Sequence, residues 1–338
     1  MIYYRPIAMT DAARPEGALT LAGGWCWFDR VEVRERDRAP QLMPAADLPA
    51  AARRALTAPR AALADLPLDR PRLMGILNVT PDSFSDGGRF LDPAAALAQG
   101  RQMAADGADI IDIGGESTRP GAAAVTVADE TARTAPVITA LRAAGLTLPI
   151  SIDTRKAAVA CAALTAGATM VNDVAAFSFD ADLAGLVARA GVPVCLMHAQ
   201  GTPQTMQADP RYDDVLLDVY DFLAGRVAAA QAAGIAADRI VVDPGIGFGK
   251  TEAHNLALIR GLSLFHGLGC AVLLGASRKR FIGMIGGGAD QAARRGPGSV
   301  AVALFAAAQG VQILRVHDIW QTRQALALWQ AVTPGVGT

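Results

Sequence analysis

The sequence lacks the features that mark secreted, disulfide-rich or membrane-spanning proteins. Its four cysteines lie far apart, with no C-x-x-C pair, which argues against a disulfide framework or a cysteine-based zinc site and favours a reducing compartment. No window approaches the roughly 18 consecutive apolar residues of a membrane span. The first sixteen residues, MIYYRPIAMTDAARPE, lack the charged-then-apolar pattern of a secretory signal. We therefore expect a soluble, cytoplasmic protein with no membrane partner.

An excess of charge of either sign is also missing. The 31 Lys and Arg residues are balanced by 32 Asp and Glu residues, which leaves a net charge of -1. No basic field is available for nucleic acid or an anionic membrane surface, so a charged ligand must be recognised locally. At 338 residues with 52% hydrophobic content, the chain can bury a large core, as one large α/β domain or two average ones.

Several catalytic motifs are absent as well. The four histidines show no H-E-x-x-H spacing and there is no G-x-S-x-G segment, so a hydrolase with a serine or cysteine nucleophile is disfavoured. His266 is interpreted as structural. The segment DPGIGFGKT at 243–251 fails as a phosphate-binding P-loop, because the position of its first required glycine is Pro244, which has no N–H. We interpret it as a glycine-rich turn that approaches a flat ligand.

From residue 72 onward, short apolar runs alternate with Ala- and Leu-rich helical stretches. Helices are predicted at 93–106, with Asp92 as N-cap, and at 213–233, ending before Gly234. Eight β-then-α units in about 260 residues predict a (β/α)8 TIM barrel, with an open doubly wound sheet as the alternative. The predicted strands are residues 72–78, 109–114, 149–153, 169–173, 192–198, 239–244, 271–275 and 312–318.

Residues 1–70 differ in texture from the rest. One or two strands are predicted within GGWCWFDRVEVRERD, at 23–37, and the stretch that follows is rich in Ala, Pro and Arg. We interpret residues 1–70 as an N-terminal extension, packed on the outside or base of the barrel, without chemistry of its own. The catalytic barrel is assigned to residues 71–338.

Every predicted strand ends in polar residues, at the end of a TIM barrel where active sites lie. One such Asp is more often a turn former or a helix cap, but eight strands in phase predict a ligand rich in N–H donors. In chain order the strand-end candidates are Asn78, Asp112, Asp153, Asn172 with Asp173, Asp243, Ser277 with Lys279, and Arg315 with His317.

The eighth strand end, RVHDIWQ, predicts an anion site. Arg315 and His317 alternate and share a face, and Asp318 is a candidate cap for the following helix. A helix N-terminus flanked by these residues attracts an anion, whereas a surface Arg with a helix-capping His is the alternative. Lys279 points a cation into the site or is a solvated helix-start lysine; Arg278 and Arg280 are interpreted as solvated.

Two long loops are candidate lids, with plain connectors as the alternative. The first, NVTPDSFSDGG at 78–88, contains Phe84. The second, GGESTRPG at 114–121, contains Thr118, Arg119 and Pro120.

Taken in order, these segments resemble the signature segments of dihydropteroate synthases. The segments are MGILNVTPDSFSDGG, DIGGESTRPGA, SIDTRK, VNDV, LMHAQGTPQTMQ, DPGIGFGKTEAHN, GASRKRFIG and PGSVAVALFAAAQGVQILRVHD. The resemblance runs from Met74 to the end of strand eight. It implies a (β/α)8 enzyme, usually a homodimer, that joins p-aminobenzoate to 6-hydroxymethyl-7,8-dihydropterin pyrophosphate by an SN1-like substitution and releases pyrophosphate.

The resemblance also implies roles for the candidate residues. Asp153, Asn172 and Asp243 would accept hydrogen bonds from the pterin, which Met197 would pack against. Mg²⁺ would bridge the pyrophosphate to Asn78, and Asp86 of the first loop is a further candidate ligand. The predicted catalytic residues are Asn78, Asp153, Lys279, Arg315 and His317, and the predicted substrate-binding residues are Asp112, Thr118, Arg119, Asn172, Met197, Asp243, Phe248, Ser277, Phe84 and Pro120.

Two apolar positions depart from the pattern, Ala199 where Met is familiar and Ile246 where Phe is common. Two alternatives share the pterin-binding segments. A methyltetrahydrofolate-corrinoid methyltransferase would have no use for the ESTRP and RVHD segments, and a non-catalytic pterin-binding paralogue would not need the loop residues that this sequence retains.

Overall fold

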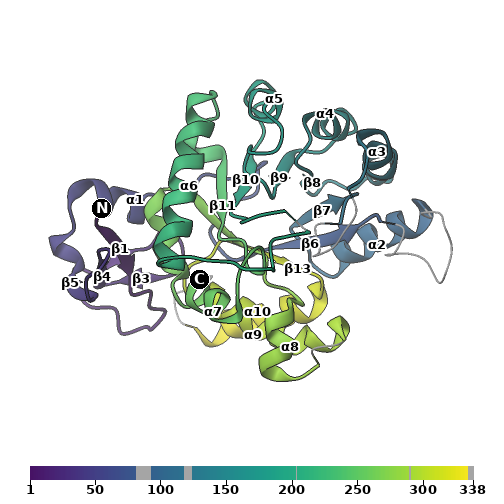
Figure 1. Ribbon diagram of the computed structural model, residues 1–338. Helices are drawn as coiled ribbons and strands as arrows, with labels where there is room; N and C mark the ends of the chain where they lie inside the picture. The colour runs from purple at the N-terminus through teal and green to yellow at the C-terminus, as the bar shows by residue number, and fades with distance from the viewer. Residues whose placement is uncertain (81–92, 118–123, 203, 289–290, 334–338) are drawn as a thin grey trace.

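The structure is a computed structural model that describes residues 1–80, 93–117, 124–202, 204–288 and 291–333. Eight parallel strands close into a barrel, in which β13 pairs with β6 to complete the ring (Figure 1). The predicted (β/α)8 barrel is confirmed, and closure of the ring rules out the open sheet. The strands are β6 (Arg72–Asn78), β7 (Ile110–Gly114), β8 (Ile150–Asp153), β9 (Met170–Asp173), β10 (Val194–Met197), β11 (Ile240–Asp243), β12 (Ala271–Leu274) and β13 (Ile313–Val316).

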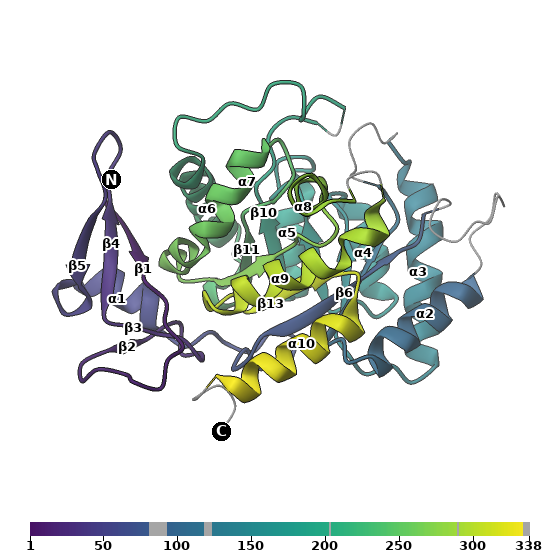
Figure 2. The ribbon, with the colours of Figure 1, turned by 90° about the horizontal axis from the view of Figure 1, so that it is seen from below.

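Helices follow the strands and cover the outside of the barrel (Figures 1 and 2). The helix predicted at 213–233 begins two residues later, because the Asp214 side chain accepts the N–H groups of Leu216 and Leu217 as the N-cap. Asp92 lies outside the described residues. The helices are α2 (Pro93–Ala105), α3 (Val127–Ala143), α4 (Ala157–Thr165), α5 (Asp182–Ala190), α6 (Val215–Ala232), α7 (Glu252–Arg260), α8 (Arg280–Gly286), α9 (Gly296–Ala307) and α10 (Ile319–Val332), with short 3-10 turns η3 (Ala237–Arg239), η4 (Leu262–Leu268) and η5 (Ala292–Arg295).

Side chains alternate along each strand between the helical layer and the barrel interior. Leu73 and Leu77 of β6, for example, pack into the core beneath the helices, whereas Met74 points inward. The lower interior is largely apolar, and most inward-facing polar side chains lie toward the carboxyl ends of the strands, which we call the mouth. None of the described helices is both long and apolar enough to span a membrane.

The lower end of the barrel is sealed by a short hairpin that precedes β6, which we call the floor hairpin (residues 63–68). Leu63 and Leu66 bond to each other through their backbones, and the two residues between them, Ala64 and Asp65, have φ of 47° and 65°. This left-handed conformation tightens the turn and aims the leucines upward. Leu63, Leu66 and Leu68 pack with apolar inward-facing side chains of the strands, which are Met74, Ile110, Met170, Cys195, Val241, Ala271, Leu273 and Ile313.

Residues 1–57 form a small module beside the barrel, next to α6 and η4 (Figure 2). Its three-stranded antiparallel sheet has the order β1 (Tyr3–Pro6), β4 (Arg30–Arg34) and β5 (Gln41–Pro44), and β2 (Leu19–Thr20) pairs with β3 (Trp27–Phe28). The 3-10 turn η1 (Ala45–Asp47) and helix α1 (Ala50–Thr57) follow. Two strands, β3 and β4, lie in the segment where one or two were predicted.

The module has its own apolar core and is tied to the barrel by polar contacts. Phe28, Val31 and Leu56 are fully buried in that core. At the junction, the Tyr3 hydroxyl donates to Asp221 on α6 at 2.8 Å, and the Trp25 indole N–H donates to the Ala307 carbonyl at 2.8 Å. The extension therefore packs on the outside of the barrel through the module and on its base through the floor hairpin.

We expect Leu63→Ala to lower the free energy of unfolding by about 2–5 kcal/mol, because it leaves a cavity under the barrel that the surrounding side chains cannot fill. Urea denaturation followed by circular dichroism measures this change. Leu42→Ala is the matched control, since Leu42 is 66% exposed and should change stability by less than about 0.5 kcal/mol. Equal effects of the two substitutions would show that Leu63 does not seal the floor.

Candidate active site

A buried ion triad spans the mouth. Arg315, at the end of β13, donates from Nε to Asp112 Oδ2 and from Nη2 to Asp153 Oδ2, both at 2.6 Å. Asp112 and Asp153 come from the neighbouring strands β7 and β8. The sequence predicted these carboxylates as acceptors for a ligand, and in the structure Arg315 already lies between two of them. Burial works to lower the pKa of Arg315, but the two carboxylates outweigh it and the net shift is upward.

Acceptors for a ligand remain around this triad. Asp112 Oδ1 is buried with no partner among the described residues. Asn172 donates from Nδ2 to Asp112 Oδ2 at 3.2 Å, which leaves its amide oxygen as an acceptor. Asp243 accepts the Gly245 N–H on Oδ1 at 2.7 Å. The mouth therefore holds more buried oxygens than the protein itself satisfies, as expected for a site that binds N–H groups.

Two strand-end glycines leave space between these side chains. A Cβ atom on Gly275, at the end of β12, would lie 3.4 Å from Asp243 Oδ2 and 3.8 Å from Arg315 Cδ. A Cβ atom on Gly114 would lie 3.4 Å from Asp153 Cβ. The sequence reasoning missed both residues, although glycine at the end of a strand is itself a sign of close ligand approach.

Burial shifts the acid side chains of the mouth toward protonation. It raises the pKa of Asp243 to about 6, although the Gly245 N–H and the cations Arg315 and Lys279 work in the opposite direction. The pKa of Asp153 is also raised, first by burial and then by the neighbouring carboxylates, against the effect of Arg315. Both carboxylates are held in a site that penalises their charge, so a ligand that donates to them relieves this penalty.

The turn after β11 presents an aromatic ring beside a cation. Gly245, Gly247 and Gly249 have φ of 69°, 83° and 63°, the left-handed conformation that glycine adopts freely. The turn places the Phe248 ring 4.0 Å from Lys279 Nζ. Lys279, a candidate from its position after strand seven, therefore lies beside the turn after β11. The turn is glycine-rich as expected, and it bears a ring rather than a phosphate cradle.

His317 and Ser277 form a second polar pair at the mouth. The His317 backbone N–H donates to Ser277 Oγ at 3.2 Å, and the ring Nδ1 lies 3.0 Å from the same oxygen. Burial, followed by the nearby Arg278, lowers the pKa of His317 to about 3. The ring is therefore neutral at pH 7, and it can donate one hydrogen bond to an anion but adds no charge.

Two expectations about neighbouring residues were wrong. Asp318 is the N-cap residue of α10, but its side chain makes no capping bond. It pairs with Arg278 instead, with an Nη2 to Oδ1 distance of 2.5 Å, so Arg278 is not solvated background. The two loops that carry Ser277 and His317 are joined by this pair. Arg280 is exposed, as expected.

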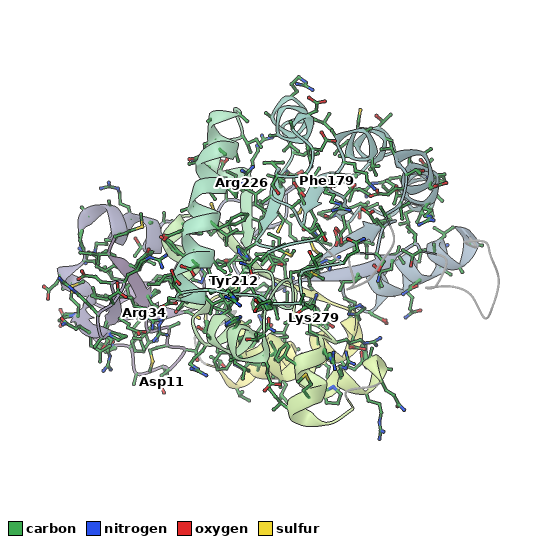
Figure 3. All side chains as sticks on the ribbon, viewed as in Figure 1. Asp11, Arg34, Phe179, Tyr212, Arg226 and Lys279 are labelled. Atoms are coloured by element: carbon green, nitrogen blue, oxygen red, sulfur yellow. The ribbon has the colours of Figure 1, made fainter. Side chains whose placement is uncertain are left out.

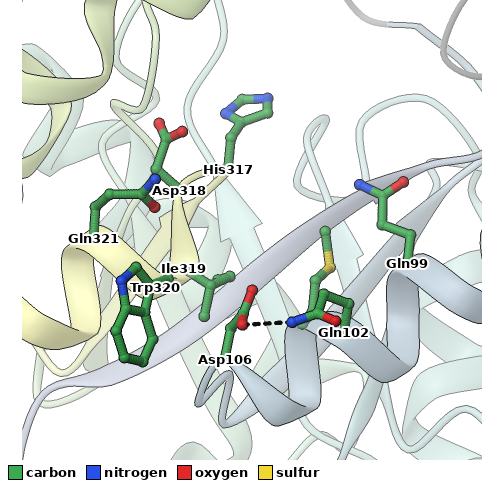
Figure 4. Close-up of a pocket in the computed structure, with 9 residues that line it drawn as sticks. Gln99, Gln102, Asp106, His317, Asp318, Ile319, Trp320 and Gln321 are labelled. Carbon is green, nitrogen blue, oxygen red and sulfur yellow. Dashed lines mark hydrogen bonds between the residues drawn. The ribbon is translucent and has the colours of Figure 1, made fainter.

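A hollow of about 270 Å³ lies beside His317, between α2 and the start of α10 (Figure 4). Gln102 donates to Asp106 at 2.7 Å along the α2 side of the hollow, and Trp320, on the α10 side, is 57% exposed. His317 thus touches Ser277 on one side and this open space on the other.

The remaining candidates are placed as follows. Met197 ends β10 in register with Asp243 and is buried. Asp173 turns away from the others and accepts the N–H groups of Ala175 and Phe177, so it is structural. Phe84, Asp86, Thr118, Arg119 and Pro120 lie outside the described residues, as do residues 81–88 and 118–121 of the two predicted lid segments. His266 is fully buried in η4, with its ring Nε2 3.0 Å from the Gln309 carbonyl oxygen.

Asn78 is a suitable ligand for a phosphate-bound Mg²⁺ ion. It ends β6 opposite Gly114 and offers one carboxamide oxygen at the mouth. Within the described ranges, no group of three or more His, Cys, Asp or Glu side chains could hold a metal. This donor set fits an ion that takes few protein oxygens and completes its shell with phosphate oxygens and water.

The fold and the site together define a barrel enzyme for a flat, nitrogen-rich ring that carries an anionic tail. The model of the family described as "Pterin binding enzyme" matches residues 74–317. A dihydropteroate synthase of Neisseria meningitidis serogroup C is 48% identical over 271 residues, which cover 79% of this chain and 95% of that protein.

Solved structures agree with this match. The Xanthomonas albilineans dihydropteroate synthase with 4-aminobenzoic acid has a TM-score of 0.76 at 49% identity, over 82% of this chain and 99% of its own. The same enzyme in complex with 7,8-dihydropteroate has a TM-score of 0.72 at 47% identity, over 80% and 96%. The chain belongs to the pterin-binding enzyme family and, within it, to the dihydropteroate synthases.

We expect Asp243→Asn to stabilise the ligand-free protein at pH 8 by on the order of 1–3 kcal/mol. The folded pKa of about 6 lies above the ordinary value of 3.8, so the stability that Asp243 contributes is complete below pH 3.8 and is lost as the pH rises through 6. The advantage of the amide should therefore shrink at pH 5. Urea denaturation at the two pH values measures it, and an equal or absent gain at both would contradict the buried-carboxylate argument.

Proposed function

We propose that the mouth of the barrel joins p-aminobenzoate to 6-hydroxymethyl-7,8-dihydropterin pyrophosphate, giving 7,8-dihydropteroate and pyrophosphate. The C–O bond between the exocyclic methylene and the diphosphate breaks first, and the diphosphate leaves with the electron pair. The amine of p-aminobenzoate then forms the C–N bond and loses a proton. The observation that carries the proposal is Arg315 held between Asp112 and Asp153, with Asp112 Oδ1 buried and unsatisfied.

The acceptors Asp153, Asn172 and Asp243 face the N–H donors of the pterin. A pterin presents a 2-amino group and ring N–H groups along one edge, and charged acceptors make the stronger hydrogen bonds to them. The ring fills the space left by Gly114 and Gly275, and Met197 packs on one of its faces. Lys279 donates to the carbonyl and N5 edge of the ring. The ligand also relieves the penalty of burying Asp153 and Asp243, which makes binding favourable in a site that is costly when empty.

Departure of the diphosphate requires positive charge and hydrogen-bond donors near the leaving oxygen. Arg315 supplies the charge, and its third nitrogen, Nη1, is not used in the pairs with Asp112 and Asp153. Neutral His317 donates one hydrogen bond, oriented by Ser277. Asn78 would hold Mg²⁺, which adds positive charge to the diphosphate when bound. Arg119, which lies outside the described residues, is proposed to add a second positive charge near the diphosphate.

The p-aminobenzoate slot is proposed to lie beside Phe248, Lys279 and Ser277. Phe248 provides an apolar ring, whereas Lys279 and Ser277 provide polar contacts. Phe84, Thr118 and Pro120 would complete the wall from the two lid segments, which would exclude water from the cationic pterin intermediate. The Xanthomonas albilineans enzyme was solved with 4-aminobenzoic acid, which supports a slot for this ring in the same fold.

The purified protein, given both substrates and Mg²⁺, should release pyrophosphate and form dihydropteroate. We expect Lys279→Ala and Asp243→Asn to weaken pterin binding, measured by titration calorimetry, by on the order of 1–3 kcal/mol each, because each loses a buried charged hydrogen bond. Arg280→Ala is the control, since Arg280 is the exposed neighbour of Lys279. A titration unchanged by either of the first two substitutions would refute the assignment.

We propose further that the chain acts in the cytoplasm as a homodimer. Large apolar side chains are exposed on α8, α9 and α10. These three helices are adjacent, since α9 contacts both α8 and α10. A group of this kind on neighbouring helices is typical of a subunit interface. The exposed residues are Met284 and Ile285 on α8, Phe305 on α9, and Trp320, Leu328 and Val332 on α10.

We expect Phe305→Glu to weaken dimerisation by on the order of tenfold or more, because it buries a charge at the centre of this face. Sedimentation velocity over a range of protein concentrations measures the dissociation constant. Leu42→Glu, at an exposed position in the N-terminal module, should have no effect. A monomeric parent protein at micromolar concentration would sink the proposal.

A further inference from the structure

Lys250, the last residue but one of DPGIGFGKT, is a buried cation that the proposed reaction does not use. Its exposure is 3%, and the pKa of its ammonium is lowered by burial to about 7. Three acceptors surround Nζ, namely the Phe248 carbonyl at 3.1 Å, His198 Nδ1 at 2.8 Å and the His198 carbonyl at 3.5 Å. These match the three donors of one ammonium group, so the group is satisfied although it is out of water.

His198 is built to receive this donor. Burial, followed by Lys250 itself, lowers the pKa of His198 to about 3, so the ring is neutral and Nδ1 can accept. The ring packs edge-on against Phe222 with centroids 4.8 Å apart, and its backbone N–H donates to the Asp243 carbonyl. His198 is therefore fixed at the end of β10 from two sides. Lys250 ties the glycine-rich turn after β11 to this fixed point.

Three consecutive carbonyl groups of the turn each accept a hydrogen bond from a side chain. Gln207 donates to the Gly247 carbonyl at 2.7 Å, Lys250 donates to that of Phe248, and the Tyr212 hydroxyl donates to that of Gly249 at 2.7 Å (Tyr212 and Lys279 are labelled in Figure 3). Two of these donors come from the segment between β10 and α6 and are partly exposed. Only the contact at Phe248 is made by a buried charge.

The turn also packs directly on the loop that follows β10, so closely that no side chain would fit between the two backbones. A Cβ atom on Gly245 would lie 1.8 Å from the His198 carbonyl oxygen, and one on Gly249 would lie 2.5 Å from the Gln200 carbonyl oxygen. Two backbones this close have little freedom to slide. The peptide that carries Phe248 is thus fixed on both sides, and its ring takes up one position against Lys279.

We propose that Lys250 is a positioning residue, which holds the Phe248 peptide so that the Phe248 ring orients Lys279 toward the pterin. The inference rests on the proposed function, since it concerns the use of Lys279 in that site. Lys250 makes no contact with substrate in this arrangement. It acts through one peptide and one ring, and a shift of about 1 Å in such a contact is enough to lower affinity substantially.

The test is a double-mutant cycle on the affinity for 6-hydroxymethylpterin, measured by calorimetry on the full chain. We expect Lys250→Met to weaken binding about tenfold in the parent protein and less than about twofold in a Lys279→Ala background, because the ring then has no cation to orient. Equal losses in the two backgrounds would overturn the proposal. A parent protein that fails to bind the pterin would instead refute the proposed function.

Arg142→Met is the matched control for a loss of stability. Arg142 also donates to three backbone carbonyls, those of Leu146, Leu148 and Gly167, but at the opposite end of the barrel. It should lower the melting temperature and leave pterin affinity unchanged. If Arg142→Met weakened binding as much as Lys250→Met, a general loosening of the fold would be the explanation and the proposal would fail.

Tyr212→Phe provides a second route if Lys250→Met does not fold. It removes the donor to the adjacent carbonyl, that of Gly249, and should weaken pterin binding in the same direction, by less than Lys250→Met, with the same dependence on Lys279. Affinity unchanged by Tyr212→Phe, together with an insoluble Lys250→Met, would count against a role for the turn.

Discussion

The site depends on one interaction, the placement of Arg315 between Asp112 and Asp153. Burying three charged groups costs several kcal/mol per ion, and only close pairing offsets that cost. The pairing joins β13 to β7 and β8, so it crosses the seam where the barrel closes. It also determines which oxygens remain for a ligand, because Asp112 Oδ1 has no partner and the Asn172 side chain, which donates from Nδ2 to Asp112, keeps its amide oxygen as an acceptor. The same three side chains thus balance the buried charge, link the strands on either side of the barrel seam and leave an acceptor for a ligand.

Much of the barrel and its mouth could be predicted from the sequence. Buried parallel strands are continuous apolar runs, so their positions and number were readable, and polar residues that end each run had to meet at one end of a closed ring. Partners distant along the chain could not be predicted. Nothing local pairs Arg278 with Asp318, 40 residues later, or places Arg315 against Asp112, 203 residues away. The neutral state of His317 depends on burial, which the sequence does not give.

The rest of the mouth shows how far a binding site conflicts with stability. Asp153 and Asp243 are held where burial opposes their charge, and Gly114 and Gly275 give up packing to leave a gap. The contacts that offset this loss of stability lie around the site rather than in it. The turn after β11 has its carbonyls bonded to Gln207, Lys250 and Tyr212, and the apolar layers below are closely packed. Function in this fold is supported by neighbouring residues that touch no substrate.

The floor hairpin has a consequence for biosynthesis. Leu63, Leu66 and Leu68 leave the ribosome before the first barrel strand is made, whereas β13, which completes the ring, is among the last segments to emerge. Each nascent strand can therefore assemble over an apolar surface that already exists, and the unfinished cylinder need not expose its lower rim to chaperones or to other chains. A gene trimmed to begin at β6 would encode the same catalytic groups but would leave that rim uncovered during translation.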